Sequence, residues 1–259
     1  MILHETDASE MSRKVRSLRP LVQCITNHTT VNDCANLLLA AGASPTIAHH
    51  PEEMEEIQQG CSALVCNLGA LEDLQAMKLA VKTAAACGHP IVIDPVGCGG
   101  SSFRRKSFRE LVAAGRPSCI RGNASEIEAL AKNSATVTGV DAAASALEQT
   151  RAAAMRLAQE LGCMVIASGA VDIITDGKTV FEEPGGDEMM PLITGTGCME
   201  SCLLAAYLAA ENSLQSAACC MRAMALCGER AAAQTRREGK GTMTFRTHFI
   251  DEMYLLERE

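Results

Sequence analysis

Aromatic residues are scarce in this sequence, which has no tryptophan, two tyrosines and five phenylalanines among 259 residues. The core must therefore be filled by Ala, Leu, Ile, Val, Met and Cys side chains. Basic residues are also few, with 23 Lys and Arg against 31 Asp and Glu, so the formal net charge is −8. This charge excludes a general nucleic-acid-binding protein, because such a protein needs clustered cations to follow the phosphates.

Long apolar runs are missing as well. No stretch approaches the ~18 residues required to span a bilayer, and residues 1–14 lack the apolar centre of a signal peptide. The thirteen cysteines are an odd number scattered through apolar segments, so they cannot form a complete internal disulfide framework. We therefore expect a cytoplasmic protein without a membrane segment.

The sequence does contain a regular alternation of short apolar runs and longer segments of helical period. The runs predict buried strands at residues 21–25, 63–66, 90–94, 118–120 and 164–167. Helices are expected between them at residues 31–41, 51–59, 71–87, 103–114, 125–132 and 145–161, with left-handed caps at Gly42, Gly60, Gly88, Gly115 and Gly162. This order predicts an α/β fold with a central, mainly parallel sheet flanked by helices on both faces.

The pattern changes after residue 170. Residues 171–176 and 178–183 predict a β-hairpin. A helical C-terminal part is expected from residues 198–210, 214–237 and a stretch beginning at 247. No linker, internal repeat or low-complexity segment divides the chain, so we expect one domain over residues 1–259.

Three segments beside predicted strand ends carry residues suited to chemistry. The carboxyl ends of parallel strands meet at one edge of a sheet, so these segments are expected to lie together. In the first segment, Asp94 closes a strand and precedes a glycine-rich loop. Such a carboxylate holds a metal or lies near phosphate oxygens, or else it forms an ordinary Asx turn.

The second segment contains Arg121, Asn123 and Glu126. Asn123 and Glu126 have the spacing of a capping box, which is the simplest explanation for the pair. Arg121 beside a carboxylate at a strand end also suits phosphates held by a divalent cation. Both interpretations stay open at this point.

The third segment runs through Gly195, Thr196, Gly197 and Cys198, at the expected start of a helix. Backbone amides at a helix N-terminus favour negative charge, so the segment predicts an anion hole. The same position is expected to lower the pKa of the Cys198 thiol, although simple packing explains most cysteines in such a chain. The six histidines lack the spacing of zinc ligands, so no zinc site is expected.

Together, the three segments are similar in order and spacing to the hydroxyethylthiazole kinase family of thiamine salvage, a member of the ribokinase superfamily. Further matches at residues 25–27, 42–45, 65–69 and 168–172 extend the resemblance from about residue 21 to residue 241. It implies a ribokinase-like fold and an enzyme that uses ATP and Mg²⁺ to phosphorylate the primary hydroxyl of 4-methyl-5-(2-hydroxyethyl)thiazole. It also implies a homotrimer with active sites at the subunit interfaces.

The resemblance implies a role for each matching residue. Asp94 and Glu126 would act around the magnesium ion, and Cys198 and Asp94 would be the catalytic residues. ATP would contact Arg121, Asn123 and Ser168, the thiazole would contact Asn27, Ile47 and Gly195, and Gly195, Thr196, Gly197 and Cys198 would form the anion hole. The sequence departs from the family pattern in three places, with Ile47 for the usual Met, Ser168 for the usual Thr and His28 for a common Asn.

Other functions fit the sequence less well than this kinase activity. A kinase of the hydroxymethylpyrimidine or pyridoxal type is the nearest alternative, but such kinases usually carry Asp at the position of Cys198. A cysteine hydrolase would need a histidine partner that no local context marks, and an NAD dehydrogenase would need a G-x-G-x-x-G segment where residues 21–30 hold no glycine. A nucleotide-binding regulator without catalysis would have no reason to combine metal carboxylates with an anion hole.

The shortage of aromatic residues also bears on nucleotide binding. With no tryptophan and few tyrosines or phenylalanines, the chain cannot easily grip adenine between two rings. We expect the base to rest in an aliphatic slot, with modest affinity and discrimination.

Overall fold

The computed structural model describes residues 5–132 and 145–256 of the chain. Its strands are β1 (Leu21–Ile25), β2 (Ser44–Thr46), β3 (Ala63–Asn67), β4 (Ile91–Asp94), β5 (Cys119–Asn123), β6 (Met164–Ser168), β7 (Val171–Thr175) and β8 (Val180–Pro184). They form one sheet in the order β2-β1-β3-β4-β5-β6-β7-β8. Neighbouring strands are parallel from β2 to β6, whereas β7 and β8 join as an antiparallel hairpin.

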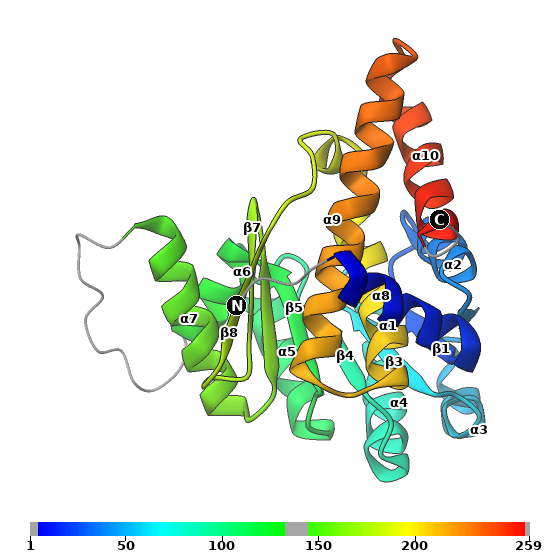
Figure 1. Ribbon diagram of the computed structural model, residues 1–259. Coiled ribbons are helices and arrows are strands. Elements are labelled where there is room, and N and C mark those ends of the chain that lie inside the picture. Colours follow the sequence, from blue (N-terminus) through cyan, green and yellow to red (C-terminus); the bar gives the residue numbers. More distant parts are fainter. Residues whose placement is uncertain (1–4, 133–144, 257–259) are drawn as a thin grey trace.

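Helices cover both faces of this sheet (Figure 1). One layer holds α1 (Glu5–Leu18), α2 (Val31–Ala40), α8 (Thr196–Ala210), α9 (Leu214–Arg237) and α10 (Thr242–Leu255). The other holds α3 (Met54–Gln59), α4 (Leu74–Cys87), α5 (Ser102–Ala114), α6 (Ala124–Lys132) and α7 (Ala146–Leu161). Three short 3₁₀ turns complete the described elements, at Pro51–Glu53, Leu71–Asp73 and Met190–Leu192. The predicted α/β architecture, with its helical C-terminal part, is confirmed.

The core has two layers because side chains alternate across each strand. In β3, Ala63 and Val65 pack with the layer that contains α8, whereas Leu64 and Cys66 pack with the layer that contains α4. Both sides are buried, which explains why the strands read as continuous apolar runs. Helix α8 lies against β3 and β4 and is buried from Met199 to Leu208. The start of this helix is therefore fixed by the core.

All thirteen cysteines are free thiols in the described part of the chain. Eleven are buried, Cys198 is half-buried and Cys87 is exposed. Burial raises the pKa of the Cys61 thiol to about 11 and that of Cys163 to about 12. Most of these thiols are therefore core residues that fill the space left by the missing aromatic side chains.

Several boundaries differ from the sequence expectations. Helix α1 and strand β2 were not expected, and β2 gives a weak signal because it is three residues long and contains Pro45. Helix α10 begins at Thr242, before the expected start at residue 247. Its N-cap is Gly241, which has no capping side chain, so the sequence carries no capping signal for this start.

The glycine caps were predicted correctly only in part. Gly42, Gly88 and Gly162 adopt positive φ, but Gly60 has φ −82° and Gly115 has φ −178°, so the prediction was wrong at these two positions. There the chain leaves the helix through a right-handed turn or in an extended conformation, neither of which needs glycine.

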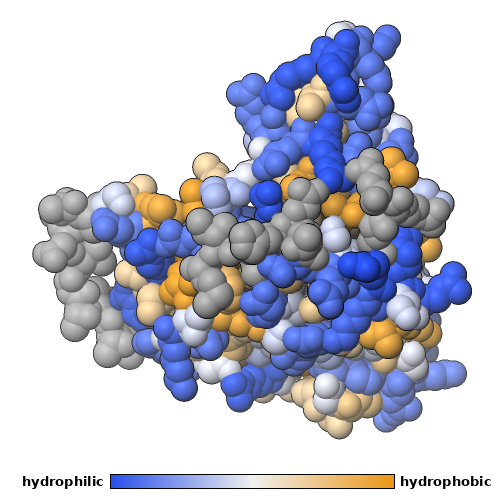
Figure 2. Space-filling model, viewed as in Figure 1, coloured by the Kyte–Doolittle hydropathy of each residue, from blue (hydrophilic) through white to orange (hydrophobic). Residues whose placement is uncertain are grey.

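The ends of α9 and α10 project beyond the sheet, and Figure 2 shows mostly hydrophilic side chains over this projection. Among the described residues, none of the helices has both the length and the apolar character needed to cross a membrane.

Candidate active site

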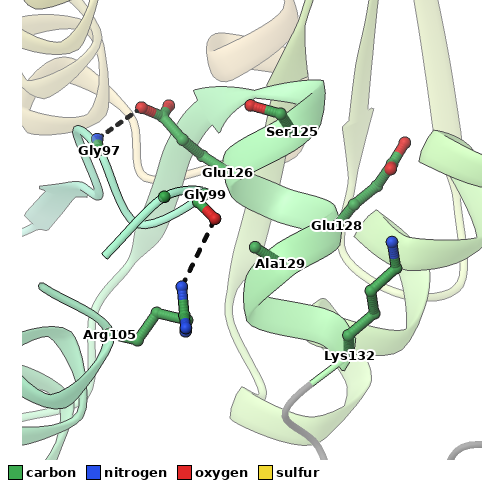
Figure 3. A pocket seen from close by; sticks show the side chains of 9 residues that line it. Gly97, Gly99, Arg105, Ser125, Glu126, Glu128, Ala129 and Lys132 are labelled. Atoms are coloured by element: carbon green, nitrogen blue, oxygen red, sulfur yellow. Dashed lines mark hydrogen bonds between the residues drawn. The ribbon is translucent and has the colours of Figure 1, made fainter. Parts of the chain in front are cut away.

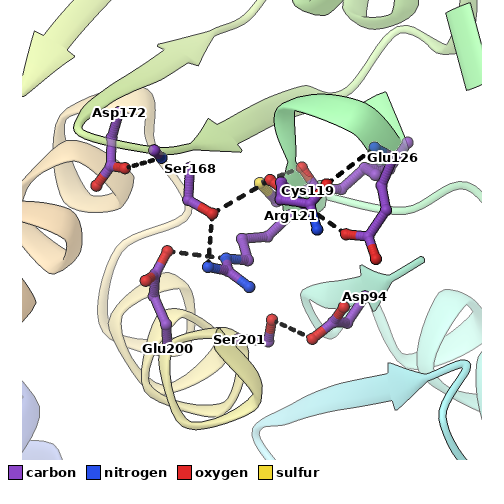
Figure 4. Close-up of polar contacts among 12 residues, drawn as sticks. Asp94, Cys119, Arg121, Glu126, Ser168, Asp172, Glu200 and Ser201 are labelled. Carbon is purple, nitrogen blue, oxygen red and sulfur yellow. Dashed lines mark hydrogen bonds and ion pairs between the residues drawn. The ribbon is translucent and has the colours of Figure 1, made fainter. Parts of the chain in front are cut away.

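Five strands bring polar side chains to one edge of the sheet, where helix α8 begins. Asn27 follows β1, Asn67 ends β3, Asp94 ends β4, Arg121 lies in β5 and Ser168 ends β6. The parallel register places Asn67 opposite Asp94 across β3 and β4. The convergence of the three segments expected from the sequence is thus a feature of the fold (Figure 4).

Asp94 is held inside this edge with 1% of its surface exposed. Its Oδ2 accepts hydrogen bonds from Asn67 Nδ2 at 2.9 Å and from Ser201 Oγ at 2.8 Å. These partners come from β3 and α8, so the side chain does not serve mainly as an Asx turn. Burial raises the pKa of the Asp94 carboxyl to about 7, against the opposing effects of Arg121 and Ser201.

Arg121 lies beside Asp94 and is also buried, with 8% exposed. Its Nε donates to Glu200 Oε1 at 2.8 Å, and its Nη2 donates to Ser168 Oγ at 2.7 Å. Burial alone would lower the pKa of the guanidinium, but the charges of Glu200 and Asp94 outweigh it and raise the pKa above its usual value. Nη1 lies over Gly197, where a Cβ would overlap it. A larger residue at this position would therefore force the guanidinium to shift.

Glu126 ties the loop after β4 to the start of α6. Its Oε2 accepts from the Asn123 amide at 2.9 Å, and Asn123 Oδ1 accepts from the Glu126 amide at 3.0 Å. The capping box expected from the sequence is therefore formed. The other oxygen, Oε1, accepts from the Gly97 amide at 2.8 Å, beside a cavity of about 480 Å³ lined also by Arg105 and Lys132 (Figure 3).

The start of α8 presents backbone amides to the same region. Gly195 is the N-cap with φ +92°, and a Cβ there would lie 2.5 Å from Thr30 Cγ2. The first bond of the helix runs from the Met199 amide to the Gly195 carbonyl at 2.8 Å. The amides of Thr196, Gly197 and Cys198 precede this bond, so they are the helix-end donors that can meet an anion.

Cys198 is flanked by two amide side chains. Its Sγ receives Asn67 Nδ2 at 3.2 Å and Asn27 Nδ2 at 3.4 Å. The expectation that the helix start lowers the pKa of this thiol is wrong. Burial and the charge of Asp94 raise that pKa to about 11, since together they outweigh the hydrogen bonds with Thr30 and Asn67, which lower it. At neutral pH the side chain is a thiol.

A cavity of about 630 Å³ opens beside Arg121. Arg121, Ser168, Thr196 and Gly197 line one part of it, and apolar residues line another, namely Ala170, Met190, Met221, Met224 and Ala225. No aromatic side chain is among its lining residues in the described chain. A Cβ at Gly228 would lie 2.5 Å from Met190 Sδ, so the methionine is wedged against α9. The carboxylates of Asp172, Asp187, Glu188 and Glu200 also line it, so the cavity combines anion donors, acidic groups and an aliphatic wall.

The sequence agrees with a known family over nearly its whole length. The model of the hydroxyethylthiazole kinase family matches residues 12–259. The chain belongs to this family. The hydroxyethylthiazole kinase of Oleidesulfovibrio alaskensis is 44% identical over 245 residues, which cover 93% of this chain and 90% of that protein.

Solved structures agree with this membership. A hydroxyethylthiazole kinase protein from Pyrococcus horikoshii OT3 is 33% identical, with a TM-score of 0.85 over 95% of this chain and 92% of that chain. A ribokinase-like superfamily protein from Enterococcus faecalis V583 shares the fold at 12% identity, with a TM-score of 0.68 over 100% of this chain and 96% of that chain. The ribokinase-like fold implied by the sequence is confirmed.

Two of the residues matched to the thiazole site of the hydroxyethylthiazole kinase family, Asn27 and Ile47, lie in neighbouring loops. Asn27 contacts Cys198 directly, whereas no hydrogen bond joins Ile47 to either residue within the described part of the chain. The rings of His28 and His49, one from each loop, are 6.4 Å apart and meet edge to face. The two loops therefore lie side by side, and the role of Ile47 as a substrate contact stays a prediction.

Three residues of this site were not assigned a role from the sequence. Asn67 Oδ1 accepts from the Gly69 amide at 2.8 Å, which fixes the side-chain amide so that its nitrogen faces both Asp94 and Cys198. On α8, Ser201 donates a hydrogen bond to Asp94, and Glu200 accepts one from Arg121. Glu200 could have been singled out from the sequence, because it is the charged residue inside the otherwise mostly apolar stretch 198–210.

Replacing Cys198 with Ala is expected to lower kcat about tenfold without abolishing turnover. A thiol whose pKa is about 11 is a poor base at neutral pH, while the backbone amides around it are unaffected by the change. Steady-state rates of ADP release by the variant and the parent measure the effect. Complete loss of turnover in a folded variant would show that the sulfur takes part in the chemical step.

Proposed function

We propose that this chain transfers the γ-phosphoryl group of ATP to the primary hydroxyl of 4-methyl-5-(2-hydroxyethyl)thiazole, a step of thiamine salvage. The proposal is carried by one arrangement: Arg121 and the start of α8 line a cavity, and Asp94 lies next to them, bonded to Ser201 of the same helix. Membership of the hydroxyethylthiazole kinase family supports the thiazole as acceptor. Hydroxymethylpyrimidine or pyridoxal is not favoured.

The chemistry follows from the charges of the site. The amides of Thr196, Gly197 and Cys198 and the free N–H groups of Arg121 would neutralise the charge that develops on the moving phosphoryl group. Asp94 would act at the attacking hydroxyl, where a carboxylate can receive its proton. Cys198 would position that hydroxyl between Asn27 and Asn67. Ser168 and Asn123 would border the ATP phosphates, and Gly195 would border the thiazole.

Magnesium fits the residues that are present. Among the described residues, no three His, Cys, Asp or Glu side chains are grouped as metal ligands. Mg²⁺ is usually bound by one or two carboxylates together with phosphate oxygens and water, which Asp94 and Glu126 can supply with a nucleotide. When bound, the ion would neutralise charge between the phosphates. Glu126 would reach it through water, because both its oxygens already accept backbone amides.

The assembly proposed for this chain is a homotrimer of single-domain subunits with active sites between neighbours. Leu39 and Leu192 are large apolar side chains left 57% and 64% exposed in one chain, which is compatible with burial in an assembly. A neighbouring subunit would then help to keep water from the site.

One assay tests the proposed reaction. ADP release would be measured with hydroxyethylthiazole, with hydroxymethylpyrimidine and without acceptor, each in the presence and absence of magnesium. We expect rapid release only with the thiazole and magnesium together. Equal rates under all three acceptor conditions would reject the assigned substrate.

A further inference from the structure

Glu200 is an unusual residue for its position. It lies near the start of the buried stretch Met199–Leu208 of α8, with 5% of its surface exposed and mostly apolar side chains after it. Burying a carboxylate is costly unless a charged partner compensates it. The core gains nothing from the charge, so the reason for it has to be sought in its partner.

That partner is Arg121. Glu200 Oε1 accepts from Arg121 Nε at 2.8 Å, and the two side chains are 7% and 10% exposed. Ser168 Oγ accepts from Nη2 at 2.7 Å. These two bonds engage two of the five N–H donors of the guanidinium and determine the plane in which it lies. Nη1 is then directed over Gly197, at the helix start.

Two further carboxylates compete for the same guanidinium. The charges of Asp94 and Asp172 both act on Arg121, and Asp94 lies on the side away from Ser168 (Figure 4). An arginine released from Glu200 would have a nearby alternative in the Asp94 carboxylate. Pairing there would engage both the cation expected to meet phosphates and the carboxylate expected to meet magnesium.

We infer that Glu200 is a positioning residue that directs Arg121 toward the helix-end amides and keeps it away from Asp94. The inference rests on the proposed phosphoryl transfer and adds a mechanism for it. Helix α8 supplies the backbone amides of the anion hole at its start. One turn later it supplies the Glu200 carboxylate, which orients the Arg121 guanidinium toward those amides. Asp94 is thereby left available to a nucleotide-bound cation.

The test compares Glu200→Ala and Glu200→Gln with the parent. We expect the alanine variant to raise the KM for ATP and the magnesium concentration for half-maximal rate by about tenfold or more, since a charge-assisted bond is lost. Glutamine keeps an oxygen that accepts from Nε, so it should restore most of both values. Glu211→Gln is the control, because this exposed carboxylate pairs with Lys14 beyond the far end of the same helix.

Calorimetric binding of ATP, with and without magnesium, separates this inference from the proposed reaction. If the parent protein binds ATP but does not phosphorylate the thiazole, the proposed substrate is rejected. The ATP-binding measurements on the Glu200 variants would still test the inference. A folded alanine variant with unchanged KM, magnesium requirement and binding, or a glutamine variant as impaired as alanine, would overturn the inference. If the alanine variant does not fold, Glu200→Leu fills the same space without the acceptor and is judged by the same result.

Discussion

Replacing Asp94 with Asn is expected to lower kcat by about 10²–10⁴-fold. Asparagine keeps the size of the side chain and one oxygen, but it removes the charge that would meet magnesium and the group that would take the proton. Steady-state ADP release at saturating ATP, thiazole and magnesium measures the loss. Glu126→Gln should also reduce turnover more than Cys198→Ala does, and full activity in both carboxylate variants would contradict these roles.

The same variant is expected to be more stable than the parent at pH 8 in metal-free buffer. Burial raises the pKa of Asp94 to about 7, above the value it takes when unfolded. Between the unfolded and the folded pKa of Asp94, the folded chain binds more protons than the unfolded chain. The free energy of unfolding therefore falls as pH rises through this range. Asn removes that dependence, and Tm should rise by roughly 2–4 °C for each 1 kcal/mol gained. A lower Tm at pH 8 would mean that the lost bonds to Asn67 and Ser201 dominate.

Replacing Gly197 with Ala is expected to lower kcat/KM for ATP by about 10²–10³-fold, the usual cost of disabling an anion-hole donor. The added Cβ would overlap Arg121 Nη1, so the guanidinium must move away from the helix start. Its neighbours Glu200 and Ser168 would be disturbed with it. The measurement is steady-state kinetics with varied ATP, accompanied by Tm.

A glycine at the start of another helix provides the control variant for Gly197→Ala. Gly241 precedes α10 with φ −111°, and a Cβ there meets nothing within 4 Å. Gly241→Ala should leave kcat/KM unchanged while adding the same methyl group. A folded Gly197→Ala variant with parental kinetics would show that the arginine does not need its close approach to α8.

The meeting of the site residues at the strand ends was accessible to sequence reasoning. The strands that were predicted are short, mostly apolar runs, and Asp94 and Ser168 stand at strand ends, where parallel topology brings them together. The glycines around Thr196 marked a helix start, and the helix begins there. These inferences succeeded because they depend on local pattern and on the geometry common to parallel sheets.

The internal contacts of the site were beyond that reasoning. Asn67 acquires its role through the amide of Gly69, and Glu200 acquires its role through an arginine 79 positions away. The pKa of Cys198 was misjudged because a helix start was considered without the burial and the Asp94 charge that only the folded chain supplies. Long-range packing and desolvation decide such properties, and neither is written in a short motif.

The unequal exposure of the thirteen thiols has a practical consequence. Cys87, at the end of α4, is exposed while eleven others are buried. A bulky maleimide dye should therefore attach at this position in the otherwise unaltered protein, and nucleotide bound beside Cys198 would shield the half-buried thiol from the reagent. The chain thus carries its own attachment point for fluorescence experiments, on the helical layer opposite α8.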